Sequence, residues 1–226
     1  KKEASIIFNR EFLPFHPNGL IFTAFTENGI ISTTYYSIGG GFVVKEASEN
    51  SKNKKIYPTS NFPFPAQKSS ELLGHCIEQK KSISEIVIEN EKSLRLEKEI
   101  DYELQRIWNT MLESIYIGCH TEGTLPGGLN VRRRAYDTYQ KLKENRPYSS
   151  QQEWLESIRK TKVKFRQILK WVSCFAMSVN EVNASLGRVV TAPTNGSAGV
   201  IPAVLMYYLV IENHKATFKH VKQFLL

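Results

Sequence analysis

The sequence predicts an α+β fold in which a short stretch of β-sheet is followed by a mostly α-helical domain. Three observations support this prediction. Residues 20–38 are rich in β-branched and aromatic residues on both sides of one Asn-Gly pair, as in a β-hairpin. Residues 49–65 are polar and then rich in proline, which is typical of a linker. From residue 66 onward, apolar residues recur every three or four positions, as on one face of a helix.

The hairpin is expected to join the strands Leu20–Glu27 and Ile30–Ile38 through Asn28 and Gly29. A type I′ turn needs positive φ at both central residues, and asparagine and glycine tolerate that region best. The sequence therefore predicts a type I′ turn with Asn28 and Gly29 at its centre.

The helical part is expected to begin with two short helices, the second of them capped by Ser84. Longer helices follow, separated by loops rich in glycine, threonine and asparagine. The clearest apolar stripe at helical spacing consists of Ile100, Leu104, Ile107, Trp108, Met111 and Ile115. The predicted helices are one that opens at Ser69, then Glu85–Asn90, Ser93–Cys119, Val131–Glu144 and Gln151–Val182.

Composition limits the partners and the location of the protein. The chain carries 30 Lys and Arg against 22 Asp and Glu, which gives a formal net charge of +8. Because acidic residues lie between most of the basic clusters, we expect solvated faces and no nucleic-acid partner. No apolar run approaches the roughly 20 residues that a membrane span needs, so we expect no membrane association. Cys76, Cys119 and Cys174 lie far apart, which favours reduced thiols in a cytoplasmic protein.

The segment Thr194-Asn-Gly-Ser-Ala-Gly199, which precedes an apolar run, has two interpretations. Asn195 or Ser197 could simply cap the following helix. Alternatively, the segment binds a small anionic or amino-acid-sized ligand, because helix N-termini attract carboxylates and glycines allow close approach. More polar groups gather here than one cap requires. The candidate ligand-binding residues are Thr191, Thr194, Asn195, Gly196 and Ser197.

A second candidate lies in the glycine-rich segment between residues 122 and 134. Its glycines permit close approach of a ligand, and its arginines could hold a carboxylate in a bidentate way. The other interpretation is a helix–helix connection with a charged, solvated first turn. The candidate residues of this second loop are Gly127, Gly128, Arg132 and Arg133.

His16-Pro-Asn-Gly19 precedes the hairpin and, taken alone, is typical of an ordinary turn. The histidines elsewhere in the chain show no spacing of metal ligands, and we expect no metal site within these residues.

Four motifs occur in order along nearly the whole chain, and together they carry a resemblance to a known family. They are His16-Pro-Asn-Gly19, Tyr35-Tyr-Ser-Ile-Gly-Gly-Gly41, Thr121-Glu-Gly-Thr-Leu-Pro-Gly-Gly-Leu-Asn-Val-Arg-Arg-Arg134 and Gly187-Arg-Val-Val-Thr-Ala-Pro-Thr-Asn-Gly196. With them the chain closely resembles the bacterial iron–sulfur-dependent L-serine dehydratases, also called L-serine ammonia-lyases.

The resemblance implies a domain plan and an activity. Residues 1–48 would be the C-terminal part of a small β domain, residues 49–65 a linker, and residues 66–226 the N-terminal part of a truncated helical catalytic domain. The implied reaction is β-elimination of water from L-serine, giving pyruvate and ammonia. It uses a [4Fe–4S] cluster as Lewis acid. The resemblance also implies that His16 and Asn18 reach the substrate from the β domain, and that a homodimer is possible.

The cluster is the main point at which the chain departs from the family pattern. The family's cluster cysteines follow the last of the four motifs, so we expect them beyond Leu226 and not at Cys76, Cys119 or Cys174. The chain would then be an internal fragment that is inactive alone. The alternative is a catalytically incomplete remnant, or a regulatory or partner-binding module.

Overall fold

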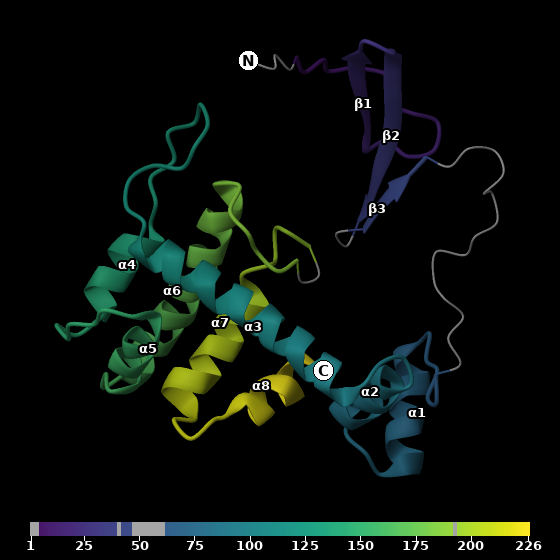
Figure 1. Ribbon diagram of the computed structural model, residues 1–226. Coiled ribbons are helices and arrows are strands. Elements are labelled where there is room, and N and C mark those ends of the chain that lie inside the picture. Colours follow the sequence, from purple (N-terminus) through teal and green to yellow (C-terminus); the bar gives the residue numbers. More distant parts are fainter. Residues whose placement is uncertain (1–4, 40–41, 47–61, 192–193) are drawn as a thin grey trace. The chain divides into compact units, whose positions relative to one another are not determined.

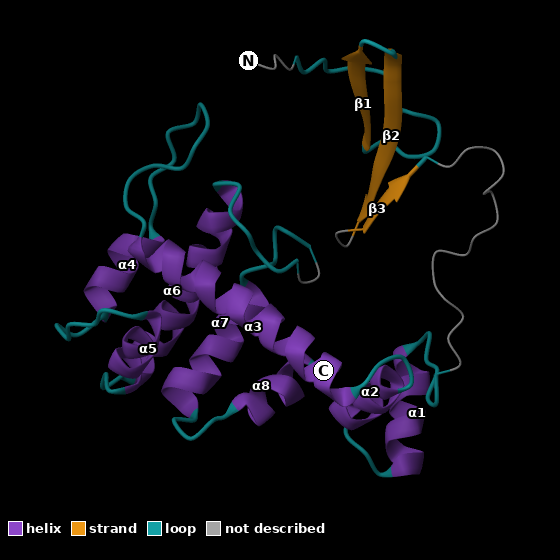
Figure 2. Ribbon diagram, in the orientation of Figure 1, coloured by secondary structure: helices purple, strands orange, loops and turns teal. Residues whose placement is uncertain are grey.

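The computed structural model describes residues 5–39, 42–46, 62–191 and 194–226. The chain divides into two compact units, Lys1–Pro58 and Thr59–Leu226, which are described separately here. The first unit holds a β-sheet and the second holds helices, as Figures 1 and 2 show. This arrangement confirms the predicted α+β class. The predicted linker, residues 49–65, lies mostly outside the described residues, and its boundaries stay a prediction.

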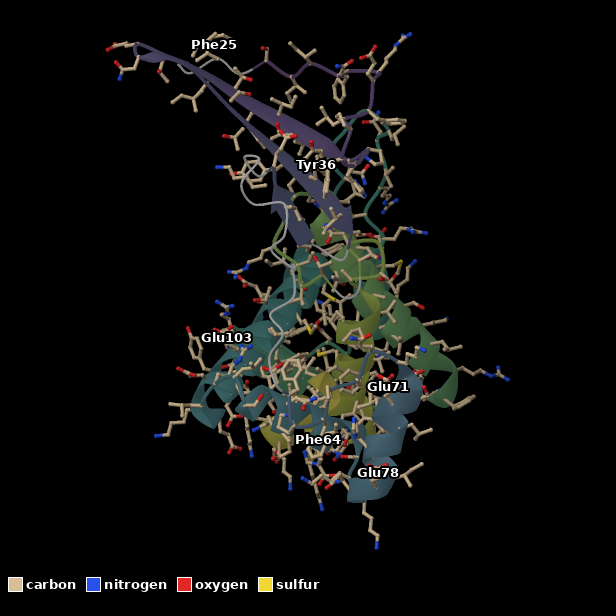
Figure 3. The ribbon with its side chains drawn as sticks, turned by 90° about the vertical axis from the view of Figure 1, so that its right-hand side faces the viewer. Phe25, Tyr36, Phe64, Glu71, Glu78 and Glu103 are labelled. Carbon is tan, nitrogen blue, oxygen red and sulfur yellow. The ribbon has the colours of Figure 1, made fainter. Side chains whose placement is uncertain are left out.

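The first unit is an antiparallel sheet of three strands in the order β1-β2-β3. Strands β1 (Gly19–Thr26) and β2 (Gly29–Gly39) form the predicted hairpin, and β3 (Phe42–Lys45) pairs with the other edge of β2. Tyr36 on β2 is 1% exposed and stacks on Phe15 with ring centroids 4.9 Å apart. Phe25, near the turn of the hairpin, is 81% exposed (Figure 3). The sheet therefore buries apolar side chains mainly around Tyr36.

The turn of the hairpin differs from the prediction. Thr26 pairs with Gly29, so Glu27 and Asn28 occupy the turn. Gly29 has a φ of 118°, whereas Asn28 is not among the residues with positive φ. The predicted type I′ turn, which needs positive φ at both central residues, is therefore wrong. The Thr26 hydroxyl donates to the Gly29 carbonyl at 2.8 Å, and a glycine with positive φ just after the turn takes up the local twist.

The second unit is helical. Among the residues that the structure describes, no helix has the length and apolar character that crossing a membrane requires. Its elements are α1 (Ser69–Gln79), α2 (Ile83–Lys92), α3 (Glu97–His120), α4 (Ala135–Leu142), α5 (Gln151–Arg159), α6 (Phe165–Ala184), α7 (Val200–Tyr207), the π-helix η2 (Tyr208–Glu212) and α8 (Phe218–Leu225).

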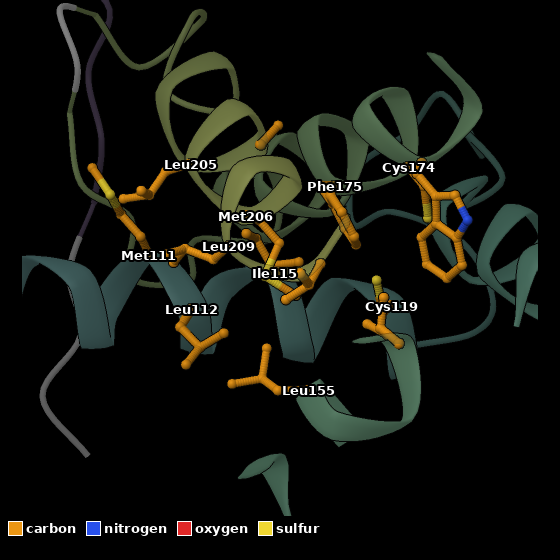
Figure 4. Close-up of a cluster of buried hydrophobic side chains, with 14 of the residues drawn as sticks. Met111, Leu112, Ile115, Cys119, Leu155, Cys174, Phe175, Leu205, Met206 and Leu209 are labelled. Carbon is orange, nitrogen blue, oxygen red and sulfur yellow. The ribbon is translucent and has the colours of Figure 1, made fainter. Parts of the chain in front are cut away.

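The core of this unit lies where α3, α6 and α7 pack together, with side chains from α5 closing one side (Figure 4). The predicted stripe of α3 is buried at Ile100, Leu104, Trp108, Met111 and Ile115. Close approach depends on glycine: a Cβ at Gly118 of α3 would meet the backbone of Ser178 on α6. A Cβ at Gly199, before α7, would lie 2.5 Å from the carbonyl oxygen of Ala176 on α6.

Several helix boundaries depart from the prediction. Ser82, rather than Ser84, caps α2, because its hydroxyl accepts from the backbone N–H of Glu85. Helix α3 begins at Glu97 rather than at residue 93, since residues 93–96 form a turn before it.

The predicted long helix over residues 151–182 is two helices, α5 and α6, separated by residues 160–164. Lys164 has an extended backbone, and the side chain of Gln167 accepts a hydrogen bond from its N–H at 2.9 Å, which starts a new helix. Phe165, expected in the buried stripe, is 86% exposed because it is the first residue of α6.

Candidate functional site

The first candidate loop, which precedes α7, has side chains bonded to each other. The hydroxyl of Thr191 donates to Oδ1 of Asn195 at 2.6 Å, and the hydroxyls of Thr194 and Ser197 lie 3.1 Å apart. A carbonyl oxygen bonded in this way fixes the orientation of the Asn195 amide. Its Nδ2 therefore presents two N–H donors, and no described residue accepts a hydrogen bond from them.

These polar side chains do not cap the next helix. Helix α7 has Gly199 as its N-cap residue, without a side-chain cap hydrogen bond. The backbone N–H of Val200 instead bonds to the Ser197 carbonyl at 3.0 Å. The interpretation of Asn195 or Ser197 as a helix cap is therefore wrong. Their polar groups have another role.

The two glycines of this loop differ in their surroundings. A Cβ at Gly196 would meet no atom within 4 Å, so the backbone is open on that side. Gly199 packs directly against the backbone of Ala176 on α6. Only Gly196 therefore offers a ligand close approach to the backbone, and Gly199 serves helix packing.

The second candidate loop, residues 121–134, folds back on itself before α4 and projects from the helical unit (Figure 1). Thr124 and Arg132 form an antiparallel bridge, supported by a hydrogen bond from Arg133 N–H to the Gly123 carbonyl at 2.9 Å. The predicted helix over residues 131–144 is consequently shorter and begins at Ala135.

The predicted residues Gly127 and Gly128 lie in the outer part of this loop, where a Cβ would meet no atom within 4 Å. Gly127 has a φ of 113°, which suits only glycine without strain. Both residues are therefore open to a ligand, and the turn itself also requires Gly127.

The three consecutive arginines have different partners. Arg132 forms an ion pair with Asp137 at 2.7 Å, and Arg133 is 8% exposed and donates to the Ser185 hydroxyl at 2.6 Å. The guanidinium of Arg134 is exposed, and no described residue bonds to it. Of the three, Arg134 is the one whose guanidinium remains available to a ligand, although the sequence singled out Arg132 and Arg133.

Glu181 on α6 is a site residue that sequence reasoning did not identify. It is 7% exposed, and its Oε1 accepts hydrogen bonds from the backbone N–H groups of Arg134 at 2.6 Å and Ala135 at 3.1 Å. Its Oε2 is buried and has no hydrogen-bond donor among the described residues. The signal was present in the sequence, because position 181 follows the buried Cys174 by seven residues and so lies on the same helix face.

Loop 121–134 and α6 enclose a pocket of about 160 Å³. The residues that line it are Leu125, Val131, Arg132, Arg134, Met177, Asn180 and Glu181. The first candidate loop adjoins the same end of α6, because Nδ2 of Asn183 lies 3.5 Å from the Asn195 carbonyl oxygen. Asn180 and Asn183 are one turn apart on α6. The structure thus brings both candidate loops of the helical unit to the C-terminal turns of α6.

His16 and Asn18 lie in the first unit, where they form a local turn. Nδ1 of His16 accepts a hydrogen bond from the Asn18 N–H at 3.2 Å, and the Asn18 carbonyl accepts from Ser37 N–H at 2.9 Å. These contacts explain the conformation of both residues within their own unit. Their reach toward a substrate stays a prediction.

The cysteines of this chain do not fit an iron–sulfur cluster. Cys76 is half-buried on α1, while Cys119 and Cys174 are buried and pack close to Ser178 in the core. A hydrogen bond with Cys119, followed by burial, raises the pKa of the Cys174 thiol, whereas a metal ligand must be a thiolate. Among the described residues, no three His, Cys, Asp or Glu side chains are placed to hold a metal ion.

The fold and these loops define a helical protein, preceded by a β unit, with candidate sites for a small polar ligand. Comparison with known proteins gives the family. Residues 78–226 match the family model described as serine dehydratase alpha chain, and residues 1–48 match the one described as serine dehydratase beta chain. The chain therefore belongs to the serine dehydratase family.

Individual relatives support this assignment. L-serine dehydratase of Haemophilus influenzae is 41% identical over 208 residues, which are 91% of this chain and 42% of the relative. L-serine dehydratase 1 of Escherichia coli is 40% identical over 204 residues, 89% of this chain and 41% of the relative. L-serine dehydratase of Helicobacter pylori is 34% identical over 232 residues, 98% of this chain and 46% of the relative. The chain thus spans less than half the length of these relatives.

Proposed function

We propose that this chain is part of an L-serine ammonia-lyase, which eliminates water from L-serine and releases pyruvate and ammonia. Family membership supports the proposal, as do the names of the relatives, which are L-serine dehydratases. Within the proposal, L-serine is the small-molecule partner and the protein acts in the cytoplasm as a homodimer.

One observation in the helical unit carries the proposal furthest. The loop over residues 191–197 concentrates polar side chains that do not cap the helix after it. The hydrogen bond from Thr191 orients Asn195 so that its N–H donors are available, and Gly196 leaves the backbone open. Two N–H donors on one amide suit a carboxylate oxygen of serine. We propose Thr191, Thr194, Asn195, Gly196 and Ser197 as substrate-binding residues, with His16 and Asn18 from the β unit and Gly127 and Gly128 from the second loop.

We propose further that a [4Fe–4S] cluster supplies the Lewis acid for the departing hydroxyl. The cysteines described above do not fit that cluster, so its ligands would belong to the part of the family's length that this chain does not span. The residues of this chain would bind and orient serine beside it.

The competing function is a catalytically incomplete remnant, or a regulatory or partner-binding module. The absence of a three-ligand metal site among the described residues favours it. Serine turnover by the protein that carries this chain, purified without oxygen, distinguishes the two. Pyruvate release supports the lyase, and serine binding without pyruvate release supports the module.

The substitution Asn195→Asp tests the role of the loop. Aspartate can still accept the hydrogen bond from Thr191, but it loses both N–H donors and adds a negative charge facing the substrate carboxylate. We expect serine turnover to fall by about 100-fold or more, since charge-assisted hydrogen bonds are each worth about 1.5–3 kcal/mol. The melting temperature should change little.

Asn109→Asp is the matched control, because Asn109 is exposed on α3 and also accepts a side-chain hydrogen bond, from Gln105 at 2.7 Å. It should leave turnover unchanged. If Asn195→Asp keeps full turnover, or loses turnover only in proportion to its stability, then Asn195 does not bind substrate.

A further inference from the structure

The pocket between loop 121–134 and α6 contains a buried charge that the protein itself only half satisfies. Glu181 uses Oε1 to bind the first backbone N–H groups of α4, while Oε2 is buried and accepts no hydrogen bond from any described residue. A buried carboxylate oxygen without a donor is costly, so a native site normally supplies one. Glu181 lines the pocket, and a ligand there can provide the missing donor.

The same pocket also contains a positive charge in need of a partner. Arg132 and Arg133 are engaged by Asp137 and Ser185, but the described part of the chain supplies no partner for the guanidinium of Arg134. Guanidinium groups bind carboxylates in a bidentate way. The pocket therefore offers an acceptor for a cationic donor and a donor for an anion, within one volume of about 160 Å³.

This combination of charges selects among ligand classes. A metal cation would be repelled by Arg134 and would find only one carboxylate, since no three-ligand group exists among the described residues. A simple anion such as phosphate would be repelled by Glu181. A zwitterion that carries an ammonium and a carboxylate on adjacent atoms complements both residues. The remaining wall of Leu125, Val131 and Met177 is apolar and accepts a carbon skeleton.

We propose that this pocket binds the head group of an α-amino acid, with Glu181 Oε2 accepting from the α-ammonium and Arg134 holding the α-carboxylate. The pocket adjoins the loop over residues 191–197 through the last turns of α6, where Asn183 lies against the Asn195 carbonyl. The proposal rests on the lyase function proposed above, and assigns to that site the two residues that distinguish an amino acid from a hydroxy acid or an amine.

Calorimetric titration of the purified chain tests this assignment. L-serine should bind, whereas 3-hydroxypropionate, which lacks the ammonium, and ethanolamine, which lacks the carboxylate, should bind at least about tenfold more weakly. Glu181→Gln keeps an oxygen for the N–H groups of Arg134 and Ala135 but removes the charge, and should weaken serine binding about tenfold or more. Arg134→Gln should do the same.

Two controls keep the outcome unambiguous. Arg166→Gln changes an exposed arginine on α6 that does not line the pocket, and should leave serine binding unchanged. Arg134→Gln alters only an exposed side chain, so the test remains valid if Glu181→Gln lowers stability. Unchanged serine affinity in Arg134→Gln, or equal affinity of the unsubstituted chain for serine and 3-hydroxypropionate, would overturn the assignment.

The failure of this inference is separable from that of the proposed function. If Asn195→Asp abolishes serine turnover while Glu181→Gln and Arg134→Gln leave serine affinity unchanged, the pocket assignment is wrong and the lyase function stands. If the unsubstituted chain does not bind serine at all, the pocket assignment is also wrong, and the lyase function is judged by turnover alone.

Discussion

His120 ends a chain of hydrogen bonds that sets its protonation state. Its Nδ1 lies 2.6 Å from the Tyr116 carbonyl oxygen, so it must carry the proton, and its Nε2 accepts from the Tyr148 hydroxyl at 2.7 Å. The Tyr148 oxygen can then accept from Tyr139 at 2.9 Å, whose oxygen accepts from Trp154 Nε1 at 3.0 Å. Each donor has one acceptor only while His120 is neutral.

This chain predicts a pH dependence of stability. Burial, the largest cause, lowers the pKa of His120 below its ordinary value of 6.5. The unfolded chain therefore binds a proton that the folded chain does not, and the free energy of unfolding falls as pH drops below 6.5. Above that pH the contribution of His120 is fully present.

We expect urea unfolding to show lower stability at pH 5.5 than at pH 7.5, and the difference to shrink in His120→Phe. That variant should also lose about 0.5–1.5 kcal/mol at pH 7.5, because Tyr148 loses its acceptor. If His120→Phe keeps the same pH dependence as the unsubstituted chain, then the titration of His120 is not its source.

At the scale of elements, glycine decides how closely the helices approach. Gly118 on α3 lies against the backbone of Ser178 on α6, and Gly74 on α1 has no atom within 4 Å of where its Cβ would be. Both glycines are inside helices. They therefore form a matched pair in which alanine has the same effect on helix propensity and opposite consequences for packing.

We expect Gly118→Ala to destabilise the protein by about 1–3 kcal/mol, because α3 and α6 must move apart. Gly74→Ala should stabilise it by about 0.5–1 kcal/mol, since alanine is the better helix former. Urea unfolding of both variants measures the two changes. A destabilising Gly74→Ala, or a neutral Gly118→Ala, would contradict the packing described for these helices.

The same scale shows where the sequence patterns were insufficient. The spacing of Trp154, Ile158 and Phe165 fits one helix, yet the chain breaks after Arg159 because side chains can cap two separate helices there. The hairpin was predictable from its β-branched strands, while its turn was not, because Asn-Gly also suits a turn in which only Gly29 has positive φ. Periodicity reports burial, and it does not report which hydrogen bonds end an element.

At the scale of the whole molecule, the sulfur atoms argue against a cluster within these residues. Cys119 and Cys174 belong to the core of the helical unit, and Cys76 lies apart from them on α1. The raised pKa of Cys174 keeps its thiol protonated. Cluster assembly would require thiolates on a common, accessible surface.

We therefore expect the chain of residues 1–226, treated with iron and sulfide in the absence of oxygen, to show no cluster absorbance near 400 nm (order of magnitude of thiolate-to-iron bands, about 400 nm). The triple substitution of Cys76, Cys119 and Cys174 by alanine should give the same spectrum. A stoichiometric cluster in the unsubstituted chain that the triple variant lacks would show that these cysteines are ligands.

The sequence by itself determined the α+β class, the hairpin, the apolar stripe of α3 and, through four motifs, the family. These features depend on local propensity and on residue types at fixed spacing, which a single chain displays directly. The tertiary structure decided which polar groups are already engaged. It paired Arg132 and Arg133, left Arg134 without a described partner, and placed Glu181 from a distant helix beneath the loop. Such pairings join residues about 50 positions apart, and neither spacing nor propensity specifies them.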